Sequence, residues 1–482
     1  MPARPAPAPN AISYRPPPMR SGEYRRAPVR QFRRDRMASR QDQLHSYQFT
    51  VQRVVAALVM RETDPLRSPF RRVAGATLVG MLLAALGIGG AAAYAVIVPG
   101  TSGKWRNENA VIVEKESGAL FVYREQRLHP VLNQASALLI LNRPGAQTVS
   151  VGRKALAGAP RGATLGIPGA PASLPTARTL HRAPWVVCAS STESTLFIGG
   201  QAGGGGAPLG DRGLLVTGPS KAIYLLFHGR KHLIRQPGAV LPALVWSGRP
   251  QTAVAQALLH AVPSGQDLVT PPVADRGRKV DGRTVGQLFG VRSGDRVDAF
   301  VLTGDGLATV TPLQAALLLA APETATVQGR AELLPLTPGE LAALVRDRPV
   351  RPLVAGAGLP AAVPELLDSV SGVACTTSEA TLTTGNVLPE APGALRTTSS
   401  SPAGTVLADK IVVAPGGGAL VRTDTGNLTL VTDLGRRHAL PVAGVLSGLG
   451  YQGVEPVTVP GEFVGLLPVG PALDPEQALS SW

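Results

Sequence analysis

The feature that most constrains this chain is an uncharged, apolar segment at residues 73–98 of 482. As an α-helix of 26 residues it would be about 39 Å long, against a hydrocarbon layer of about 30 Å. Fifteen arginines, no lysine and five acidic residues precede it, and Arg71 and Arg72 adjoin it directly. The positive-inside rule therefore predicts one membrane-spanning helix at 73–98, with the N-terminus in the cytoplasm and residues 99–482 outside it.

A cleaved signal peptide is the alternative interpretation of this segment. The apolar core is too long for one, and it begins only after residue 72. Even if the chain began at Met37, 36 residues would precede it. We therefore expect a permanent anchor, and the basic residues before it then suit anionic lipid rather than nucleic acid.

The cytoplasmic part is expected to change character near residue 40. Residues 1–40 are rich in Arg and Pro and are predicted to be disordered. Residues 41–72 are predicted to form an amphipathic helix, because apolar residues recur at helical spacing: Leu44, Tyr47, Val51, Val54, Val55, Leu58 and Val59. Two interpretations stay open, a helix that lies on the membrane or a partner, and a plain extension of the span.

The part beyond the membrane has the composition of a β-rich α+β fold. The chain contains 55 Gly and 44 Pro but only 4% aromatic residues, which favours short strands, turns and short helices. Four stretches share the order apolar strand, tight turn, second strand and apolar helix, near residues 118–142, 211–248, 296–321 and 417–451. One such unit cannot bury its apolar face alone, so the four are expected to pack on one another or on a central core.

Two helix starts within this domain are explicit in the sequence. Thr311 and Pro312 suit the cap and first position of a helix, and Thr337 with Glu340 forms a capping box. Residues 143–184 and 392–405 are dominated by turn-forming residues, so we expect loops there.

The two cysteines of the chain, Cys188 and Cys375, both lie in the predicted external part. An even count in an oxidising compartment favours a disulfide, which the chain-entropy model values at roughly 5 kcal/mol for so long a loop. Two buried free thiols are the alternative. Metal binding by two isolated cysteines is not expected, because metal sites need clustered ligands.

No motif that carries catalytic chemistry emerges from the sequence. The only Gly-Lys pair, Gly103–Lys104, is followed by Trp105, so the P-loop of nucleotide-binding proteins is missing. None of the seven His precedes Glu, no Ser stands three residues before a Lys, and GPSKA at 218–222 lacks the last Gly of a nucleophile elbow. We therefore predict no catalytic, cofactor-binding or metal-binding residue, and no enzymatic activity.

Three features invite weaker alternatives. His228 and His232 would face each other across the hairpin of the second unit, but a metal site needs a third ligand. The four glycines at 203–206 suit a flexible loop better than a phosphate loop. Asp305 and Gly306 suit a hairpin turn better than a catalytic acid.

The ordered set of motifs resembles EccB, a membrane component of actinobacterial type VII secretion systems. The similarity begins at MASRQDQLHSYQFTVQRVVAALVMRETDPLR (37–67) and continues through the apolar segment to LHPVLNQASALLIL (128–141). There follow, in the same order, GIPGAPASLP with Trp185 and Cys188, GLATVTPLQAALLLA (306–320), LVTDLGRRHALP (430–441), LGY (449–451) and LLPVGPALDPEQA (466–478). The Arg- and Pro-rich residues 1–36 depart from the family.

The resemblance implies a scaffold. EccB-like proteins combine one span with an extracytoplasmic domain of four quasi-repeats around a central β-rich core, which a disulfide crosslinks. They assemble with copies of themselves and with other membrane subunits, including a cytoplasmic FtsK/SpoIIIE-like ATPase, into an inner-membrane complex. An ATPase activity has been suggested for the family, and the missing P-loop argues against it here.

We therefore expect a structural subunit that scaffolds the extracytoplasmic side of a type VII secretion complex in the cell membrane, without cofactor or nucleic acid. A membrane-anchored protein that binds peptidoglycan or acts as a sensor is the main alternative, and the few aromatic residues argue against it. An ectoenzyme is the third reading, and it lacks the expected cluster of acids with Ser or His.

Overall fold

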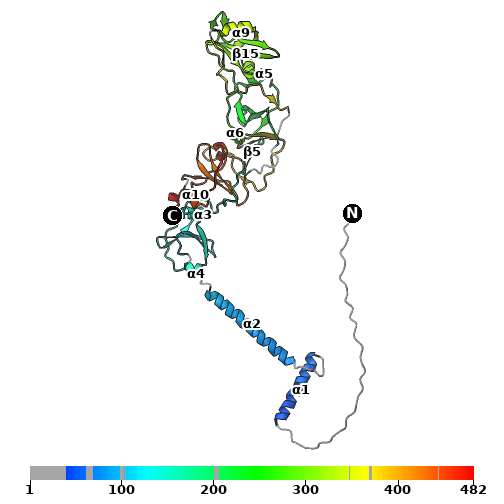
Figure 1. Ribbon diagram of the computed structural model, residues 1–482, viewed down its shortest axis with the longest axis vertical. Helices are drawn as coiled ribbons and strands as arrows, with labels where there is room; N and C mark the ends of the chain where they lie inside the picture. The colour runs from blue at the N-terminus through cyan, green and yellow to red at the C-terminus, as the bar shows by residue number, and fades with distance from the viewer. Residues whose placement is uncertain are drawn as a thin grey trace, which may run out of the picture. The chain divides into compact units, whose positions relative to one another are not determined.

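The computed structural model describes residues 40–60, 69–97, 103, 105–199, 206–346, 348–368, 372–442 and 444–482 (Figure 1). Within the first two ranges, side chains are described for 40–55, 57, 58 and 75–91. The chain divides into two compact units, Met1–Pro99 and Gly100–Trp482. The predicted disordered tail, apart from Arg40, and the side chains of Arg71 and Arg72 lie outside the described residues.

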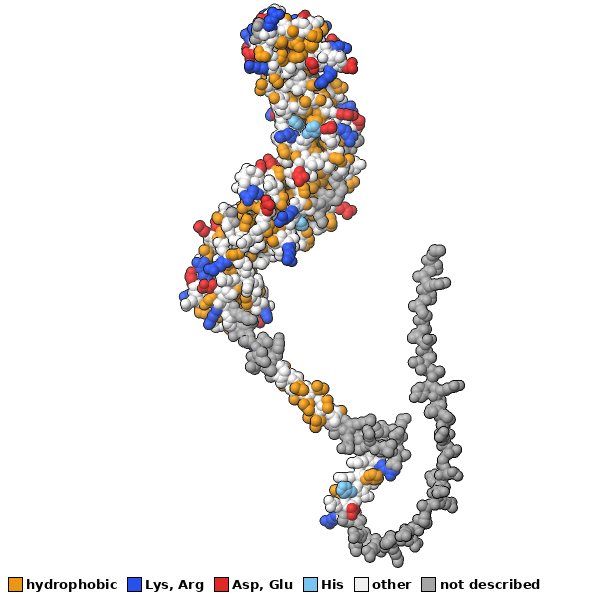
Figure 2. Space-filling model, in the orientation of Figure 1, with side chains coloured by type: hydrophobic (Ala, Val, Ile, Leu, Met, Phe, Trp, Pro, Cys, Tyr) orange, Lys and Arg blue, Asp and Glu red, His pale blue; other side chains and the backbone are white. Residues whose placement is uncertain are grey.

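The first unit contains two helices, α1 (Arg40–Met60) and α2 (Pro69–Ile97). The helix predicted over 41–72 is thus divided between α1 and the start of α2, where Pro69 suits a first turn because that turn needs no N–H from it. The described side chains of α2 form an apolar run without charge (Figure 2). Among the described residues, the structure contains no helix with both the length and the apolar character needed to cross a membrane.

The second unit contains four sheets with one shared topology. In each, three antiparallel strands follow one another in the chain, a helix comes next, and a later strand pairs in parallel with the first. The first sheet consists of β1 (Ala110–Glu114), β2 (Leu120–Arg124), β3 (Arg127–Val131) and β4 (Gln147–Val151), with helix α3 (Gln134–Leu141). The second consists of β8 (Arg212–Thr217), β9 (Ile223–Phe227), β10 (Arg230–Leu233) and β11 (Thr252–Ala253), with α5 (Pro237–Ala243), and β19 (Glu365–Leu366) also pairs with β8.

The third and fourth sheets repeat this order. The third consists of β14 (Leu288–Ser293), β15 (Arg296–Thr303), β16 (Gly306–Val310), β17 (Leu334–Pro335) and β18 (Arg351–Pro352), with α7 (Pro312–Leu319). The fourth consists of β24 (Gly418–Arg422), β25 (Leu428–Thr432), β26 (Arg437–Leu440) and β27 (Val457–Thr458), with α10 (Val445–Gly448). The predicted order of strand, turn, strand and helix is present in all four sheets. In each, one additional strand precedes it in the chain: β1, β8, β14 or β24. That the four are copies of one unit stays a prediction.

A central, mostly antiparallel sheet brings together strands from two distant parts of the chain, residues 186–208 and 373–412. Its order is β22 (Leu395–Arg396), β23 (Lys410–Val412), β6 (Ser194–Phe197), β5 (Val186–Ala189), β20 (Val373–Thr377), β21 (Leu382–Gly385) and β7 (Ala207–Pro208). The remaining elements are short: α4 (Arg153–Leu156), α6 (Gln256–Ala261), β12 (Lys279–Val280), β13 (Arg283–Thr284), α8 (Pro322–Gln328), α9 (Pro338–Val345), α11 (Gly461–Gly465) and α12 (Pro475–Ala478).

Shared cores join the sheets of the second unit. The largest core combines the central sheet with apolar residues of the second and fourth sheets and contains the fully buried Trp185. Another core packs α3 against the fourth sheet, and α3 and α10 lie side by side in Figure 1. A third core packs Leu313 and Leu317 of α7 against the second sheet. Burial of apolar surface therefore ties the first sheet to the fourth, the third to the second, and the second and fourth to the central sheet.

Candidate functional site

The disulfide lies at the centre of the central sheet. Cys188 on β5 and Cys375 on β20 stand directly opposite each other on neighbouring antiparallel strands and are bonded. Both are buried, among Phe197 and Val373. Because the two residues are 187 apart in sequence, this bond fixes the first strands of the sheet to a segment that arrives only after the second and third sheets are complete.

The histidines predicted to flank one hairpin do not converge. His228 lies in the exposed turn, and its Nε2 is 2.9 Å from Oδ1 of Asp211. His232 is buried, and its Nδ1 is 2.8 Å from the carbonyl oxygen of Gln266. In the described part of the chain, no three His, Cys, Asp or Glu side chains gather closely enough to hold a metal ion.

The remaining predicted positions have structural roles. Thr311 and Thr337 both cap helices, as the sequence predicted, and the capping box predicted at Thr337 is matched by a second one between Thr311 and Gln314. Asp305 lies in the two-residue turn between β15 and β16. Of the four glycines at 203–206, only Gly206 is within the described residues.

In three of the four sheets, one contact recurs between the third strand and a later segment that lies beside it, and the sequence patterns did not predict it. In each, a histidine on the third strand packs its ring against a glycine 32 or 33 residues later, where a Cβ atom would come within 2.2–2.4 Å of the ring. The Nδ1 of that histidine donates to the carbonyl oxygen of the residue after the glycine, at 2.8–3.0 Å. We call this contact the His–Gly clasp, formed by His129 with Gly162, His232 with Gly265, and His438 with Gly470.

Two backbone hydrogen bonds accompany each clasp. In the first sheet the N–H of Leu128 donates to Pro160, and the N–H of Gly162 donates back to Leu128. The residues equivalent to Leu128 are Lys231 and Arg437, and each makes the same pair of bonds with a Pro-x-Gly segment. The signal in the sequence is therefore a histidine followed after about 30 residues by Pro-x-Gly, at 160–162, 263–265 and 468–470.

Burial affects the protonation of two clasp histidines. Desolvation lowers the pKa of His232 and of His438 below the usual value, and it outweighs the hydrogen bonds to backbone carbonyls, which raise the pKa. Both rings are therefore neutral at pH 7, with the proton on the nitrogen that donates.

The third sheet lacks the clasp. Its strand register places Ala308 at the histidine position, since Ala308 pairs with Val301 as His232 pairs with Leu225. The glycine position is taken by Val350, three residues before Leu353, just as Gly162 stands three residues before Leu165. Leu353 still donates its N–H to the third strand, at Thr309, as Leu165 does at Pro130.

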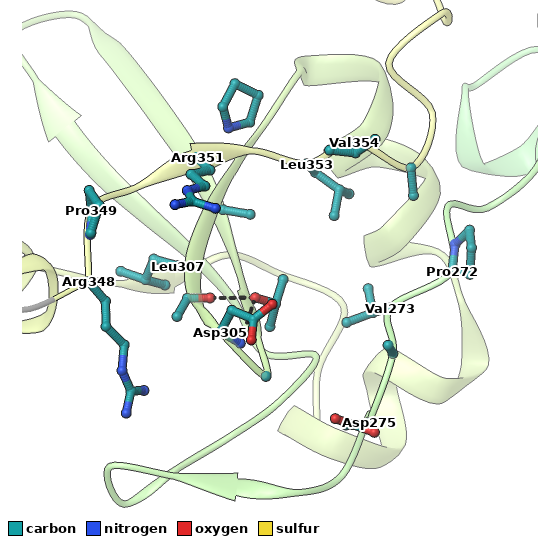
Figure 3. A pocket seen from close by; sticks show the side chains of 17 residues that line it. Pro272, Val273, Asp275, Asp305, Leu307, Arg348, Pro349, Arg351, Leu353 and Val354 are labelled. Carbon is teal, nitrogen blue, oxygen red and sulfur yellow. Dashed lines mark hydrogen bonds between the residues drawn. The ribbon is translucent and has the colours of Figure 1, made fainter.

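A cleft of about 680 Å³ lies where the clasp is missing. Figure 3 shows Arg348 and Arg351 on one side of it, Val273 and Asp275 on the other, and Asp305 on the hairpin turn between them. Leu307, Ala308 and Leu353 are among its lining residues, and Val354, 84% exposed, stands at its rim. The cleft therefore combines an apolar lining with two guanidinium groups and two carboxylates.

Comparison with known proteins relates most of the chain to one family. The family model for the type VII secretion system ESX-1 transport TM domain B, EccB, matches residues 36–481. The chain belongs to this family. The EccB resemblance predicted from the ordered motifs is thereby confirmed, from just before Met37 to the last residues.

Curated EccB proteins match over most of their length. The chain is 28% identical to the ESX-3 secretion system ATPase EccB3 of Mycobacterium tuberculosis over 492 aligned positions, which cover 91% of this chain and 88% of the relative. It is 30% identical to the ESX-5 secretion system ATPase EccB5 of the same organism, over 63% of this chain and 62% of the relative.

Solved EccB structures share the fold. A chain of an intact ESX-5 inner membrane complex superimposes with a TM-score of 0.62 and 25% identity, over 93% of this chain and 96% of that one. A chain of the EccB3 dimer from the ESX-3 core complex gives a TM-score of 0.60 at 27% identity, over 77% and 100%. The β-rich α+β fold of this EccB chain is therefore the fold of subunits in ESX membrane complexes.

Proposed function

We propose that this EccB chain is a structural subunit of a type VII secretion complex and scaffolds the extracytoplasmic side of the export apparatus. The observation that carries the proposal is the likeness to a chain of an ESX-5 inner membrane complex over 93% of the sequence. The construction of the second unit supports it, because shared cores join different sheets and one disulfide joins two strands of the central sheet that are far apart in sequence. Such crosslinking suits a part that holds other subunits in fixed positions.

The membrane topology is part of this proposal. We infer that residues 73–98 cross the bilayer once, with Arg71 and Arg72 on the cytoplasmic side and residues 99–482 outside. The uncharged length of the segment and the family membership support this, and the segment extends beyond the described side chains at both ends.

The proposed partners are other subunits of the same complex. We infer self-association, because a relative forms an EccB3 dimer, and contact with further membrane subunits, among them an FtsK/SpoIIIE-like ATPase. The relatives carry the word ATPase in their names, but the P-loop is missing from this sequence. We therefore assign nucleotide hydrolysis to a partner and not to this chain.

Co-purification from detergent-solubilised membranes tests the role. A tag on the C-terminus should recover the chain together with a P-loop ATPase and polytopic membrane subunits. Recovery of the chain alone, with binding to isolated peptidoglycan instead, would favour a wall-binding or sensor protein and refute the secretion role.

Cysteine labelling tests the topology. In intact cells, a membrane-impermeant maleimide should label a cysteine introduced at the exposed Ser400, but should not label one introduced at Ser46. The two introduced cysteines serve as controls for each other. Labelling of Ser46→Cys alone would invert the proposed orientation.

A further inference from the structure

The first sheet ends in a strand that has a neighbouring strand on one side only. β4 is the last strand in the order of that sheet and pairs in parallel with β1. The N–H of Gln147 and the C=O of Val151 both bond to the β1 side. By the alternation along a strand, the N–H and C=O groups of Thr148 and Ser150 therefore face the opposite way. In the described part of the chain, neither strand pairing nor any other hydrogen bond engages these outward groups.

This edge lacks the features that usually keep the edges of sheets apart. Proteins shorten an edge strand, cover it, or place Pro or a charge on it. β4 has five residues, QTVSV, with neither a charge nor Pro. The other late parallel strands, β11, β17, β18 and β27, have two residues each. The edge strands β3, β10 and β26 are covered by the segments that carry the His–Gly clasps. Among the sheet edges that the structure describes, the edge of β4 is therefore the longest one left open.

We propose that the β4 edges of two copies of this chain pair with each other, antiparallel and around a two-fold axis. This inference rests on the self-association proposed above and assigns a surface to it. In the matching register, Val149 stands opposite Val149 of the second copy, and Thr148 stands opposite Ser150. The outward N–H groups of each copy then donate to the outward C=O groups of the other, and the two four-stranded sheets become one continuous sheet.

The side chains along β4 favour a second copy as the occupant of this edge. An uncharged strand offers no ion pair to a charged segment, and no like charges oppose each other when it pairs with itself. On the exposed face, Thr148 meets Ser150 of the second copy, a pair of hydroxyl groups that suits neighbouring strands. On the other face, Val149 meets its own equivalent, and each packs against the apolar core that contains Val151 and Leu156.

The place of the first sheet in the chain strengthens a contact that has few hydrogen bonds. Only residues 98–109 separate α2 from β1, so the first sheet is the nearest of the four, along the chain, to the proposed span. Two copies anchored in one bilayer therefore hold their first sheets at a high effective concentration. A pairing that is weak between free chains becomes stable between anchored ones.

Disulfide trapping in the membranes of cells that make the full chain tests this register. Under oxidant, Val149→Cys should form a covalent dimer, because facing residues of a non-hydrogen-bonded antiparallel pair have Cα atoms about 4.5 Å apart. Val297→Cys, on a strand of the third sheet and 50% exposed, is the matched control and should stay monomeric. The native cysteines are bonded to each other in both variants.

Two variants at Ser150 isolate the backbone hydrogen bonds. An edge strand tolerates Pro where the lost N–H faces solvent, so Ser150→Pro should keep the fold. Combined with Val149→Cys, it should lower the yield of crosslinked dimer at least about tenfold, because the symmetry removes a donor from both copies at once. Ser150→Ala keeps the N–H and should leave the yield nearly unchanged.

A charge exchange tests the same contact without touching the backbone. Thr148→Glu with Ser150→Glu, at two exposed positions, sets like charges opposite each other and should also suppress the Val149→Cys dimer. Co-expression with a differently tagged copy that carries Thr148→Lys, Ser150→Lys and Val149→Cys should restore crosslinking, now between the two tags.

Three results would overturn the proposal: no Val149→Cys dimer, a dimer that both Ser150→Pro and the paired Glu variant leave unchanged, or an adduct of Val149→Cys with a different protein in place of the dimer. A missing dimer in a chain that still co-purifies with the other membrane subunits would count against this interface and not against the secretion role. The two proposals therefore fail separately.

Discussion

At the scale of the residue, the side chains at two positions decide whether a sheet contains the His–Gly clasp. The clasp requires a glycine because the histidine ring occupies the position of any Cβ atom, not because of an unusual backbone angle. The third sheet changes both partners, to Ala308 and Val350, and opens a cleft instead. The two clasp positions are therefore coupled.

Replacement of a clasp glycine measures this coupling. Gly265→Ala should lower the free energy of unfolding by about 1–3 kcal/mol, since the added methyl would overlap the His232 ring. His232→Ala should also destabilise, but the double variant should lose less than the sum of the two, because alanine at the histidine position makes room for the methyl. Additive losses in urea denaturation would show that the two positions act independently.

The buried histidines predict a dependence of stability on pH. The folded pKa of His232 and of His438 lies below the unfolded value of 6.5, so the unfolded chain binds protons first as the pH falls. Their contribution to stability should therefore be complete above about pH 6.5 and decline below it, toward the folded pKa. Thermal unfolding between pH 7.5 and 5 should show this decline.

A double variant provides the control for the pH experiment. His232→Gln with His438→Gln should have a lower melting temperature at pH 7.5 and a smaller further loss at pH 5. An identical pH slope in the variant and the wild type would assign the decline to other groups.

At the scale of the element, local sequence chemistry defines where several helices begin. The side chain of Thr311 accepts from the N–H of Gln314, and the amide oxygen of Gln314 accepts from the N–H of Thr311. The same Gln314 donates to the carbonyl of Ala355 at 2.9 Å, which fixes one wall of the cleft. A helix cap thus also positions a neighbouring segment.

Removal of the cap on α7 should destabilise the third sheet. Thr311→Ala should cost about 1 kcal/mol of unfolding free energy, because the first turn loses a hydrogen-bond acceptor. Thr311→Ser keeps the hydroxyl and should cost much less. Equal losses for the two variants, measured by urea denaturation, would mean that the methyl group and not the hydroxyl matters.

At the scale of the whole molecule, one covalent bond joins segments that the chain separates widely. The central sheet combines strands that precede the second and third sheets in the chain with strands that follow them. The disulfide joins β5, from the first group, to β20, from the second. Burial of both cysteines protects the bond from reductant while the sheet is folded.

Loss of this bond should weaken the second unit strongly. Cys188→Ala with Cys375→Ala should reduce unfolding free energy by up to about 5 kcal/mol, the chain-entropy value for so long a loop. The midpoint of denaturant unfolding should fall by a matching amount, and reductant should lower the wild-type midpoint but not that of the variant. An unchanged midpoint in the double alanine variant would contradict the expected role.

The sequence by itself determined the features that depend on neighbours along the chain. The apolar segment, the hairpin order, the caps at Thr311 and Thr337 and the EccB motifs all follow from local spacing and side-chain chemistry. The tertiary structure alone decided which residues distant in the chain meet. The pairing partner of β1 and the clasp of His438 with Gly470 depend on segments that return to a sheet after long connections. Such contacts leave no period in the sequence, because their spacing is set by packing and not by the repeat of a helix or strand.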